Sequence, residues 1–379
     1  MTRIEWVEGG ASRSALWRSE SGWPAPKKVV TADDTMSADA AYRLALDGTA
    51  LLWRGDFQNA RQLLQALARR IDHKGERGRR AKAGKLPATP TEAFHRHRLQ
   101  QLQRARTLAM VLIPFEADHT IPLRRAPDAR LACLEAYGVA EEPYVASLRE
   151  LLGVIGAHEW RRKGVHIPAL DERIHPWYGV FSPVRGEYVE LVAQAPLPGG
   201  AKTAFDIGAG TGVLSAVLAH RGLQVTATDM DVRALGCARE NISRLGLASQ
   251  VDIVEADLFP EGQAPLVVCN PPWLPGKPSS SIEYAIYDPD SRMLRGFLGG
   301  LKAHLAPGGE GWLIMSDLAE HLGLRSREQL LGWIVDAGLE VVARHDTRPV
   351  HPKASDQDDP LHMARSKEVT SLWRLKVAG

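Results

Sequence analysis

The chain has 379 residues, of which 44% are apolar and 24% are charged, and its formal net charge is +2. These values exclude disordered and fibrous proteins and leave room for two globular domains. No apolar stretch approaches the roughly 18 residues of a membrane-spanning helix, and the N-terminus lacks the apolar core of a secretory signal. The three cysteines, Cys133, Cys237 and Cys269, are too few and too scattered for a disulfide framework or a zinc cluster. We therefore expect a cytoplasmic protein without a metal centre.

The N-terminal part of the chain has helical patterning. Apolar residues recur with helical spacing over 36–70, 94–112 and 142–155. These segments predict a mainly α-helical N-terminal domain over residues 1–170. We expect this domain to recognise the substrate.

Basic residues dominate the segment 69–106, which holds twelve Lys and Arg against three acids. Its part rich in Gly, Ala, Lys and Pro, residues 75–90, predicts a loop. A basic loop of this kind can bind the phosphates of a nucleic acid. The alternative is a solvated loop without a ligand, because Phe94 is the one aromatic residue available to stack on bases.

Residues 171–379 alternate between strand and helix patterns. Strand patterns lie at 202–207, 223–229, 251–255, 265–269, 311–316, 339–344 and 370–376. Helical patterns lie at 184–193, 212–221, 231–244, 291–305 and 325–337. Such alternation predicts an α/β fold with a doubly wound, Rossmann-like sheet of seven strands. The polar stretch 346–368 has no clear helix, so the last two strands are expected to form an antiparallel hairpin.

A glycine-rich turn follows the first strand of this half. The strand carries Asp206, and the turn carries Gly208, Gly210 and Gly212 before a helix begins. Glycines have no Cβ, so a ligand can lie against the backbone. Dinucleotide folds carry G-x-G-x-x-G here, but Val213 replaces the last glycine, which disfavours an NAD-dependent oxidoreductase. Asp206 disfavours a phosphate ligand and favours an amine-bearing one.

Two acids follow the next two strands. Asp229 ends the second strand, where a carboxylate can accept from both hydroxyls of a ribose. Asp257, followed by Leu258, comes after the third strand, where it can accept from an adenine amine. The alternative is that both aspartates merely cap the following helices.

The tetrapeptide Asn270-Pro271-Pro272-Trp273 follows the fourth strand. Its prolines have fixed φ and keep the preceding residues extended, so this corner is stiff. It presents the Asn270 side-chain oxygen beside the Pro271 carbonyl, and these two acceptors can hold both hydrogens of a planar NH₂ group. Such bonds strengthen as the nitrogen becomes positive. Trp273 adds a flat face for stacking. We predict Asn270, Pro271 and Trp273 as catalytic residues and Pro272 as a substrate contact; the alternative is a simple turn.

Residues 202–258 resemble the cofactor half of class I S-adenosylmethionine-dependent methyltransferases. The resemblance implies S-adenosylmethionine as the cofactor, with the three glycines beside its methionine part. It also implies that Asp229 binds the ribose and that Asp257 lies at the adenine end. Asp206 and Leu258 are further candidates for cofactor binding. Asn-Pro-Pro-aromatic is similar to the signature of amino-methyltransferases that act on glutamine amides, adenine N6 or guanine N2.

The segment before this domain's first helix has the residue types of another known motif. Glutamine methyltransferases of the HemK/PrmC type carry Pro-Arg-Pro-x-x-Glu near cofactor and substrate, and Pro183, Arg185 and Glu187 are similar in type. Their spacing differs and the second proline is missing. The resemblance implies that Phe181, Pro183 and Glu187 contact the substrate; the alternative is a simple entry to a helix.

These observations together predict an S-adenosylmethionine-dependent N-methyltransferase that acts on a planar amine of a macromolecule. The basic segment favours RNA slightly as that partner, and a protein glutamine is the alternative. A second alternative is a non-catalytic RNA-binding protein on a methyltransferase scaffold. We expect no membrane partner.

Overall fold

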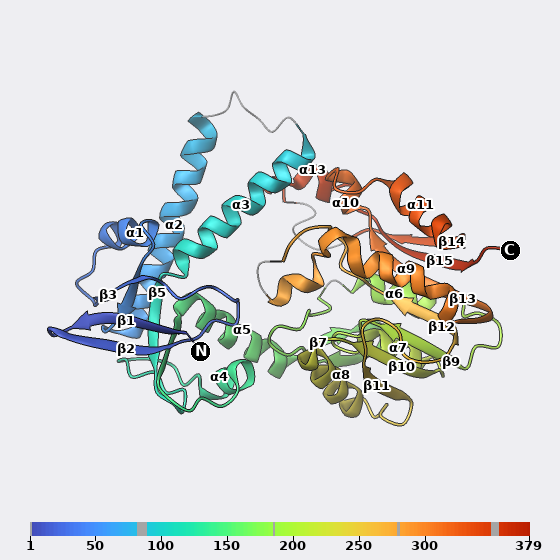
Figure 1. The fold of residues 1–379 in the computed structure, drawn as a ribbon, viewed down its shortest axis with the longest axis horizontal. Helices are drawn as coiled ribbons and strands as arrows, with labels where there is room; N and C mark the ends of the chain where they lie inside the picture. The colour runs from blue at the N-terminus through green and yellow to red at the C-terminus, as the bar shows by residue number, and fades with distance from the viewer. Residues whose placement is uncertain (1, 82–88, 185, 279–280, 350–355) are drawn as a thin grey trace. The chain divides into compact units, whose positions relative to one another are not determined.

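The computed structural model describes residues 2–81, 89–184, 186–278, 281–349 and 356–379. The chain divides into two compact units (Figure 1). The first comprises Met1–Ala88 and His95–Glu159, and the second comprises Thr89–Phe94 and Trp160–Gly379. The division thus falls at residue 160, whereas the sequence predicted it at residue 170. No helix in the described part of the chain is long and apolar enough to cross a membrane.

The first unit is built on a six-stranded sheet with the strand order β1-β2-β6-β5-β4-β3. The strands are β1 (Arg3–Glu8), β2 (Ala11–Trp17), β3 (Lys28–Ala32), β4 (Thr49–Trp53), β5 (Val111–Phe115) and β6 (Tyr144–Ser147). The helices are α1 (Ala38–Leu46), α2 (Phe57–Ala81), α3 (Pro90–Leu108), α4 (Arg130–Tyr137) and α5 (Leu148–Lys163). Ile4, Leu52, Leu112 and Val145 pack into one cluster on this sheet.

The prediction of a mainly α-helical N-terminal domain missed the six-stranded sheet on which this unit is built. Strands β4 and β6 lie inside segments whose apolar spacing predicted helices, and β5 begins at the end of another such segment. Every residue of these three strands is buried. A short strand buried on both faces has no apolar–polar alternation, so its periodicity cannot distinguish it from a helix.

The structure contradicts part of the loop predicted for the basic segment. Helix α2 extends over 75–81, which was predicted as loop, whereas helix α3 agrees with the helix predicted from residue 94. The remainder of the predicted loop, residues 82–88, lies outside the described residues.

The second unit contains a seven-stranded sheet with the order β11-β10-β9-β12-β13-β15-β14. Its strands are β9 (Thr203–Ile207), β10 (Gln224–Asp229), β11 (Val251–Glu255), β12 (Ala264–Cys269), β13 (Leu305–Ser316), β14 (Leu339–Thr347) and β15 (Thr370–Val377). The first five pair in parallel, and β15 is antiparallel to both β13 and β14. Each strand predicted for this half is present. The predicted hairpin is present too, but its connection includes the short helix α13 (His362–Arg365).

Helices cover both faces of this sheet. The helices of the second unit are α6 (Glu187–Gln194), α7 (Val213–His220), α8 (Val232–Arg244), α9 (Arg292–His304), α10 (Leu318–His321) and α11 (Arg327–Asp336). A separate two-stranded sheet is formed by β7 (Val165–Ile167) and β8 (Glu172–Ile174). Residues of α6 and α7 share one apolar cluster, and residues of α9 and α11 share another. This is the doubly wound arrangement.

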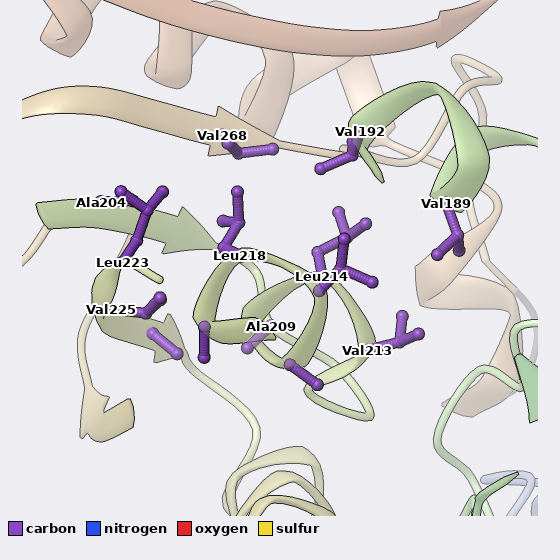
Figure 2. Close-up of a cluster of buried hydrophobic side chains, with 14 of the residues drawn as sticks. Val189, Val192, Ala204, Ala209, Val213, Leu214, Leu218, Leu223, Val225 and Val268 are labelled. Carbon is purple, nitrogen blue, oxygen red and sulfur yellow. The ribbon is translucent and has the colours of Figure 1, made fainter. Parts of the chain in front are cut away.

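Alternation along the strands explains why two clusters form. Ala204 and Val268 belong to the cluster with α7, and their neighbours Phe205 and Val267 belong to the cluster with α9. Successive side chains of a strand point to opposite faces, so a strand covered on both sides is apolar throughout. Figure 2 shows the first cluster, in which Leu218 of α7 lies among side chains from the strands.

The carboxyl ends of β9, β10, β11, β12 and β13 lie at one edge of the sheet, because these strands are parallel. Strand β15 runs the other way, with Thr370 opposite Ser316, so the segment before β15 reaches the same edge. In open α/β sheets, ligands bind in the crevice beyond the carboxyl ends of the strands.

Candidate active site

A cavity of about 870 Å³ opens at this edge, within the second unit. We call the lining residues 208–211, 228–231 and 256–258 the glycine half of the cavity. We call the lining residues 270–274, 284–287, Leu318, Arg365 and Glu368 the Asn270 half. A volume of this size is typical of pockets for small molecules and cofactors.

The glycine turn has a backbone that side chains rarely tolerate. Gly208, Gly210 and Gly212 have φ of 77°, 55° and 78°. A Cβ added at Gly208 would lie 2.5 Å from Cε of Met293, which also lines the cavity. The missing Cβ atoms therefore leave space for a ligand against the backbone.

The N–H groups of this turn are used within the fold. Gly208 and Ala209 donate to the Thr228 carbonyl at 2.9 and 2.8 Å. Gly210 donates to Oδ2 of Asp229 at 3.0 Å. A phosphate-binding turn presents such N–H groups to its ligand. In this turn the N–H groups of Gly208, Ala209 and Gly210 are already bonded within the protein and are not directed at a ligand. This arrangement is unlike that of a phosphate-binding turn.

Asp229 is clamped by two backbone N–H groups. Its Oδ1 accepts from Asp231 at 2.9 Å, and its Oδ2 accepts from Gly210. Burial raises the pKa of Asp229, and these hydrogen bonds oppose that rise. The carboxylate lines the glycine half, where its remaining lone pairs can accept from ligand hydroxyls.

Asp206 lies behind the turn. Its side chain accepts from the Ser215 hydroxyl of α7, and the residue is 1% exposed. It is not among the residues that line the cavity. Burial raises the pKa of Asp206 to about 6, and the hydrogen bonds of Ser215 counteract this rise. Its position anchors α7 to β9, and a direct contact with the cofactor stays a prediction.

Asp257 and Leu258 close the far end of the glycine half. Asp257 is exposed and forms an ion pair with Arg292 at 2.7 Å. Leu258 has a φ of 76°, and its carbonyl accepts from the Thr228 hydroxyl. The Leu258 side chain lies over Gly296 of α9, where an added Cβ would come within 2.6 Å of it. The strained backbone of Leu258 thus places its side chain between the cavity and α9.

Contacts of Trp273 with Asn270 and with Tyr188 stabilise the Asn270 corner. The indole N–H of Trp273 donates to Oδ1 of Asn270 at 2.9 Å. The Trp273 ring meets Tyr188 edge-on, with ring centres 6.5 Å apart and planes at 90°. Pro271 is buried, and Pro272 also lines the cavity. The side-chain amide of Asn270 is therefore held in one orientation, with its oxygen toward the indole.

Hydrogen bonds from residues that are distant in sequence also hold this corner. Leu274 donates to the Ile286 carbonyl at 3.1 Å and accepts from the Asp288 N–H at 2.9 Å. The Arg325 guanidinium, which is 4% exposed, donates to the Trp273 carbonyl at 3.4 Å. These bonds join the corner to two other segments of the unit.

Only part of the segment that was predicted to contact the substrate lines the cavity. Phe181 lines the cavity. Pro183 is buried and Glu187 is the first residue of α6, and neither is among the lining residues. Arg185 lies outside the described residues. The roles of Pro183 and Glu187 as substrate contacts remain predictions.

Several lining residues were not found from the sequence. Tyr188 and Met293 lie on helices, where their spacing indicated only an apolar face. Arg365 and Glu368 lie in the polar stretch between the last two strands, which has no periodic signal. Recognising them requires knowing that β15 starts at the edge where β13 ends.

Neither metal nor disulfide chemistry is indicated in the described ranges. No group of three or more His, Cys, Asp or Glu side chains there is placed to hold a metal ion. Cys133, Cys237 and Cys269 are buried and free.

Comparison with known proteins agrees with this geometry. Residues 178–325 match the family model "Methyltransferase small domain". The chain is 34% identical over 184 residues to a tRNA1(Val) (adenine(37)-N6)-methyltransferase of Shewanella loihica, covering 45% of this chain and 72% of the relative. It is 31% identical over 170 residues to a release factor glutamine methyltransferase of Moorella thermoacetica, covering 38% of this chain and 59% of the relative.

A solved ribosomal protein L11 methylase from Lactobacillus delbrueckii subsp. bulgaricus is similar at 16% identity and a TM-score of 0.37, covering 55% of this chain and 87% of that one. The sequence matches, together with the glycine turn, the clamped Asp229 and the Asn270 corner, define the class. The chain belongs to the S-adenosylmethionine-dependent methyltransferases that carry the methyltransferase small domain. Its cofactor is S-adenosylmethionine, and the side-chain-free glycine turn with the adjacent Asp229 fits that molecule.

The glycines of the turn provide a matched pair of substitutions. A methyl group at Gly212 would lie 3.2 Å from Cβ and 3.3 Å from Cα of Ala238, whereas one at Gly210 meets nothing within 4 Å. Both substitutions to Ala incur left-handed strain of about 1–2 kcal/mol. We expect Gly212→Ala to lower the unfolding midpoint in denaturant clearly more than Gly210→Ala, because Ala238 must also move. Equal losses would contradict the packing described for Gly212.

The buried carboxyl of Asp206 predicts a pH dependence. Its pKa of about 6 exceeds the value of roughly 3.9 for an unfolded aspartate. Between these values the folded protein holds a proton that the unfolded chain has lost, so this group stabilises the fold as pH falls from 7 to 4. Asp206→Asn removes the titration. The stability of this variant relative to wild type should therefore be greater at pH 7.5 than at pH 4.5. A difference that does not change with pH would disprove the buried titration.

Proposed function

We propose that the protein methylates the exocyclic amine of an RNA base. The observation that carries the proposal is the position of Asn270 and Pro271 in the same cavity as the glycine turn and Asp229. One half of the cavity suits the cofactor, and the other half presents two hydrogen-bond acceptors to a planar amine. Trp273 provides a flat surface beside them.

The cofactor supplies a methyl group bound to positively charged sulfur. Asn270 Oδ1 has two lone pairs, of which one accepts from Trp273 and the other suits an N–H of the acceptor. The Pro271 carbonyl takes the second N–H. Both bonds strengthen as the nitrogen gains positive charge, so they stabilise the transition state more than the bound substrate. With the cofactor bound, the acceptor nitrogen would take the methyl group as the S–C bond breaks toward sulfur, and its surplus proton would leave to water.

On the cofactor side, the proposed contacts follow from the lining residues. Asp229, fixed by two backbone N–H groups, accepts from the ribose hydroxyls. Asp257 and Leu258 lie at the adenine end, and Gly208 and Gly210 lie along the methionine part. Asp206 acts from behind the turn by holding α7 in place.

Two observations favour RNA as the acceptor. The relative from Shewanella loihica, which this chain matches over 72% of the relative's length, is named for methylation of a tRNA adenine. The segment 69–106 has a large excess of Lys and Arg, which suits contacts with a phosphate backbone. The second candidate acceptor is a protein glutamine, favoured by the similarity to a release factor glutamine methyltransferase.

The acceptor class can be tested with labelled S-adenosylmethionine and a lysate of cells that lack the protein. We expect the purified protein to transfer label to material that RNase destroys and protease leaves intact. Label that resists RNase and yields to protease would overturn the RNA proposal in favour of a protein acceptor.

The Asn270 corner predicts a graded pair of variants. Asn270→Ala removes one of the two acceptors and should lower kcat by roughly 10²–10³. Trp273→Phe keeps the aromatic face but removes the N–H that orients Asn270, so its loss should be about tenfold or less. Affinity for S-adenosylmethionine, measured by calorimetry, should stay unchanged in both variants. Near-normal turnover of Asn270→Ala at saturating substrate would remove this residue from the mechanism.

A further inference from the structure

Residues 89–94 belong to the second unit, although they lie in the N-terminal part of the chain. They include the first turn of helix α3, which begins at Pro90 and continues without a break to Leu108. The remainder of this helix, from His95 onward, belongs to the first unit. A segment far upstream of the matched family domain, residues 178–325, therefore forms part of the catalytic unit.

Phe94 is the buried residue of this segment. It is 2% exposed, and its side chain shares one apolar cluster with residues of the second unit. The buried members of that cluster are Phe94, Leu274, Leu318, Ala319, Leu322, Leu361 and Ala364. The sequence indicated Phe94 as the aromatic residue of the basic segment that could stack on bases, and its burial contradicts that role.

The cluster around Phe94 adjoins the Asn270 half of the cavity. Leu274 and Leu318 belong to the cluster and also line the cavity. Ile286 and Tyr287 pack against the cluster and line the cavity too. Phe94 itself is not among the lining residues, and its ring centre lies 6.4 Å from that of Tyr287. Phe94 therefore supports this wall of the cavity from the side that faces away from a ligand.

A hydrogen bond holds the start of the segment. The Thr91 hydroxyl donates to the Leu322 carbonyl at 2.9 Å, and the Gly323 carbonyl lies 3.3 Å from the same hydroxyl oxygen. Gly323 has a φ of 68°, and a Cβ added there would lie 2.6 Å from Oγ1 of Thr91. The segment thus lies in close contact with the residues that follow α10.

The wall that Phe94 supports includes the backbone of the Asn270 corner. Leu274 follows Trp273 directly, and its N–H and carbonyl are bonded to Ile286 and Asp288. A displacement of Leu274 would therefore move the corner and the 284–287 wall together. Because both acceptors of the corner have to meet the hydrogens of one amine, a displacement of about 1 Å can lower the rate by about 100-fold.

We infer that Phe94 is a positioning residue for methyl transfer, which holds the Asn270 corner in place through Leu274 and Tyr287. The inference rests on the proposed function, because it takes the Asn270 half as the half that receives the acceptor. Phe94 contacts the wall of that half and not the glycine half. Its removal should therefore slow methyl transfer without weakening the binding of S-adenosylmethionine.

The test compares variants of the full-length protein in the transfer of label to the acceptor that the wild type methylates. Phe94→Ala should lower kcat by about 10–100-fold and leave the Kd for S-adenosylmethionine, measured by calorimetry, unchanged. Phe94→Leu keeps most of the apolar volume, so its kcat should lie between those of Phe94→Ala and wild type. Leu301→Ala is the matched control, because Leu301 is buried in α9 and does not line the cavity. It also leaves a cavity in the core but should keep the wild-type kcat.

Rates are expressed per folded molecule, counted from the stoichiometry of S-adenosylmethionine binding. Wild-type kcat in Phe94→Ala would overturn the inference. An equal loss of kcat in Leu301→Ala would also overturn it, since the effect would then come from general destabilisation. A parallel loss of affinity for S-adenosylmethionine in Phe94→Ala would do the same. If Phe94→Ala does not fold, Phe94→Leu decides, and wild-type kcat in that variant would count against the inference.

Failure of the proposed function has a different signature. Label in protein and not in RNA, with the wild-type enzyme, would overturn the RNA proposal. The same variants are then compared on that protein acceptor, so the role of Phe94 is tested in either case.

Discussion

The active site depends on a turn in which three glycines adopt positive φ. Gly208, Gly210 and Gly212 let β9 turn directly into α7, a helix that is buried along nearly its whole length. The N–H groups of Gly208, Ala209 and Gly210 donate to the Thr228 carbonyl and to Asp229, so the start of the turn is held by β10. The absence of side chains then leaves the hollow in which S-adenosylmethionine fits.

Three buried or half-buried carboxylates have different places around that hollow. Asp206 is enclosed behind the turn, where burial raises its pKa and its hydroxyl partner is in α7. Asp229 faces the glycine half with both oxygens already bonded to backbone N–H groups. Glu368 also lines the cavity, and its Oε1 accepts from the Ser316 hydroxyl. The same functional group thus anchors a helix, suits ribose hydroxyls or holds the end of a strand, according to what surrounds it.

How far sequence patterns predict structure differs between the two units. In the second unit, β12 is a continuous apolar run and β10 alternates apolar with polar residues, and each was found close to its observed ends. In the first unit, β4 and β6 are short and wholly buried and adjoin helices, so their apolar residues merged with the helical pattern. A periodicity argument needs one solvated face, and these strands have none.

The sequence alone determined the elements of the catalytic unit, the glycine turn, Asp229 and the stiff Asn270 corner, because each depends on residue types within a few positions. The burial of Asp206 away from the cavity, the contacts of Trp273 with Tyr188 and Arg325, and the placement of Glu368 in the cavity wall were decided by tertiary structure. Glu368 is separated from Asn270 by almost a hundred positions in the printed sequence. Only the antiparallel return of β15 beside β13 brings both to one edge of the sheet, and no local pattern specifies that pairing.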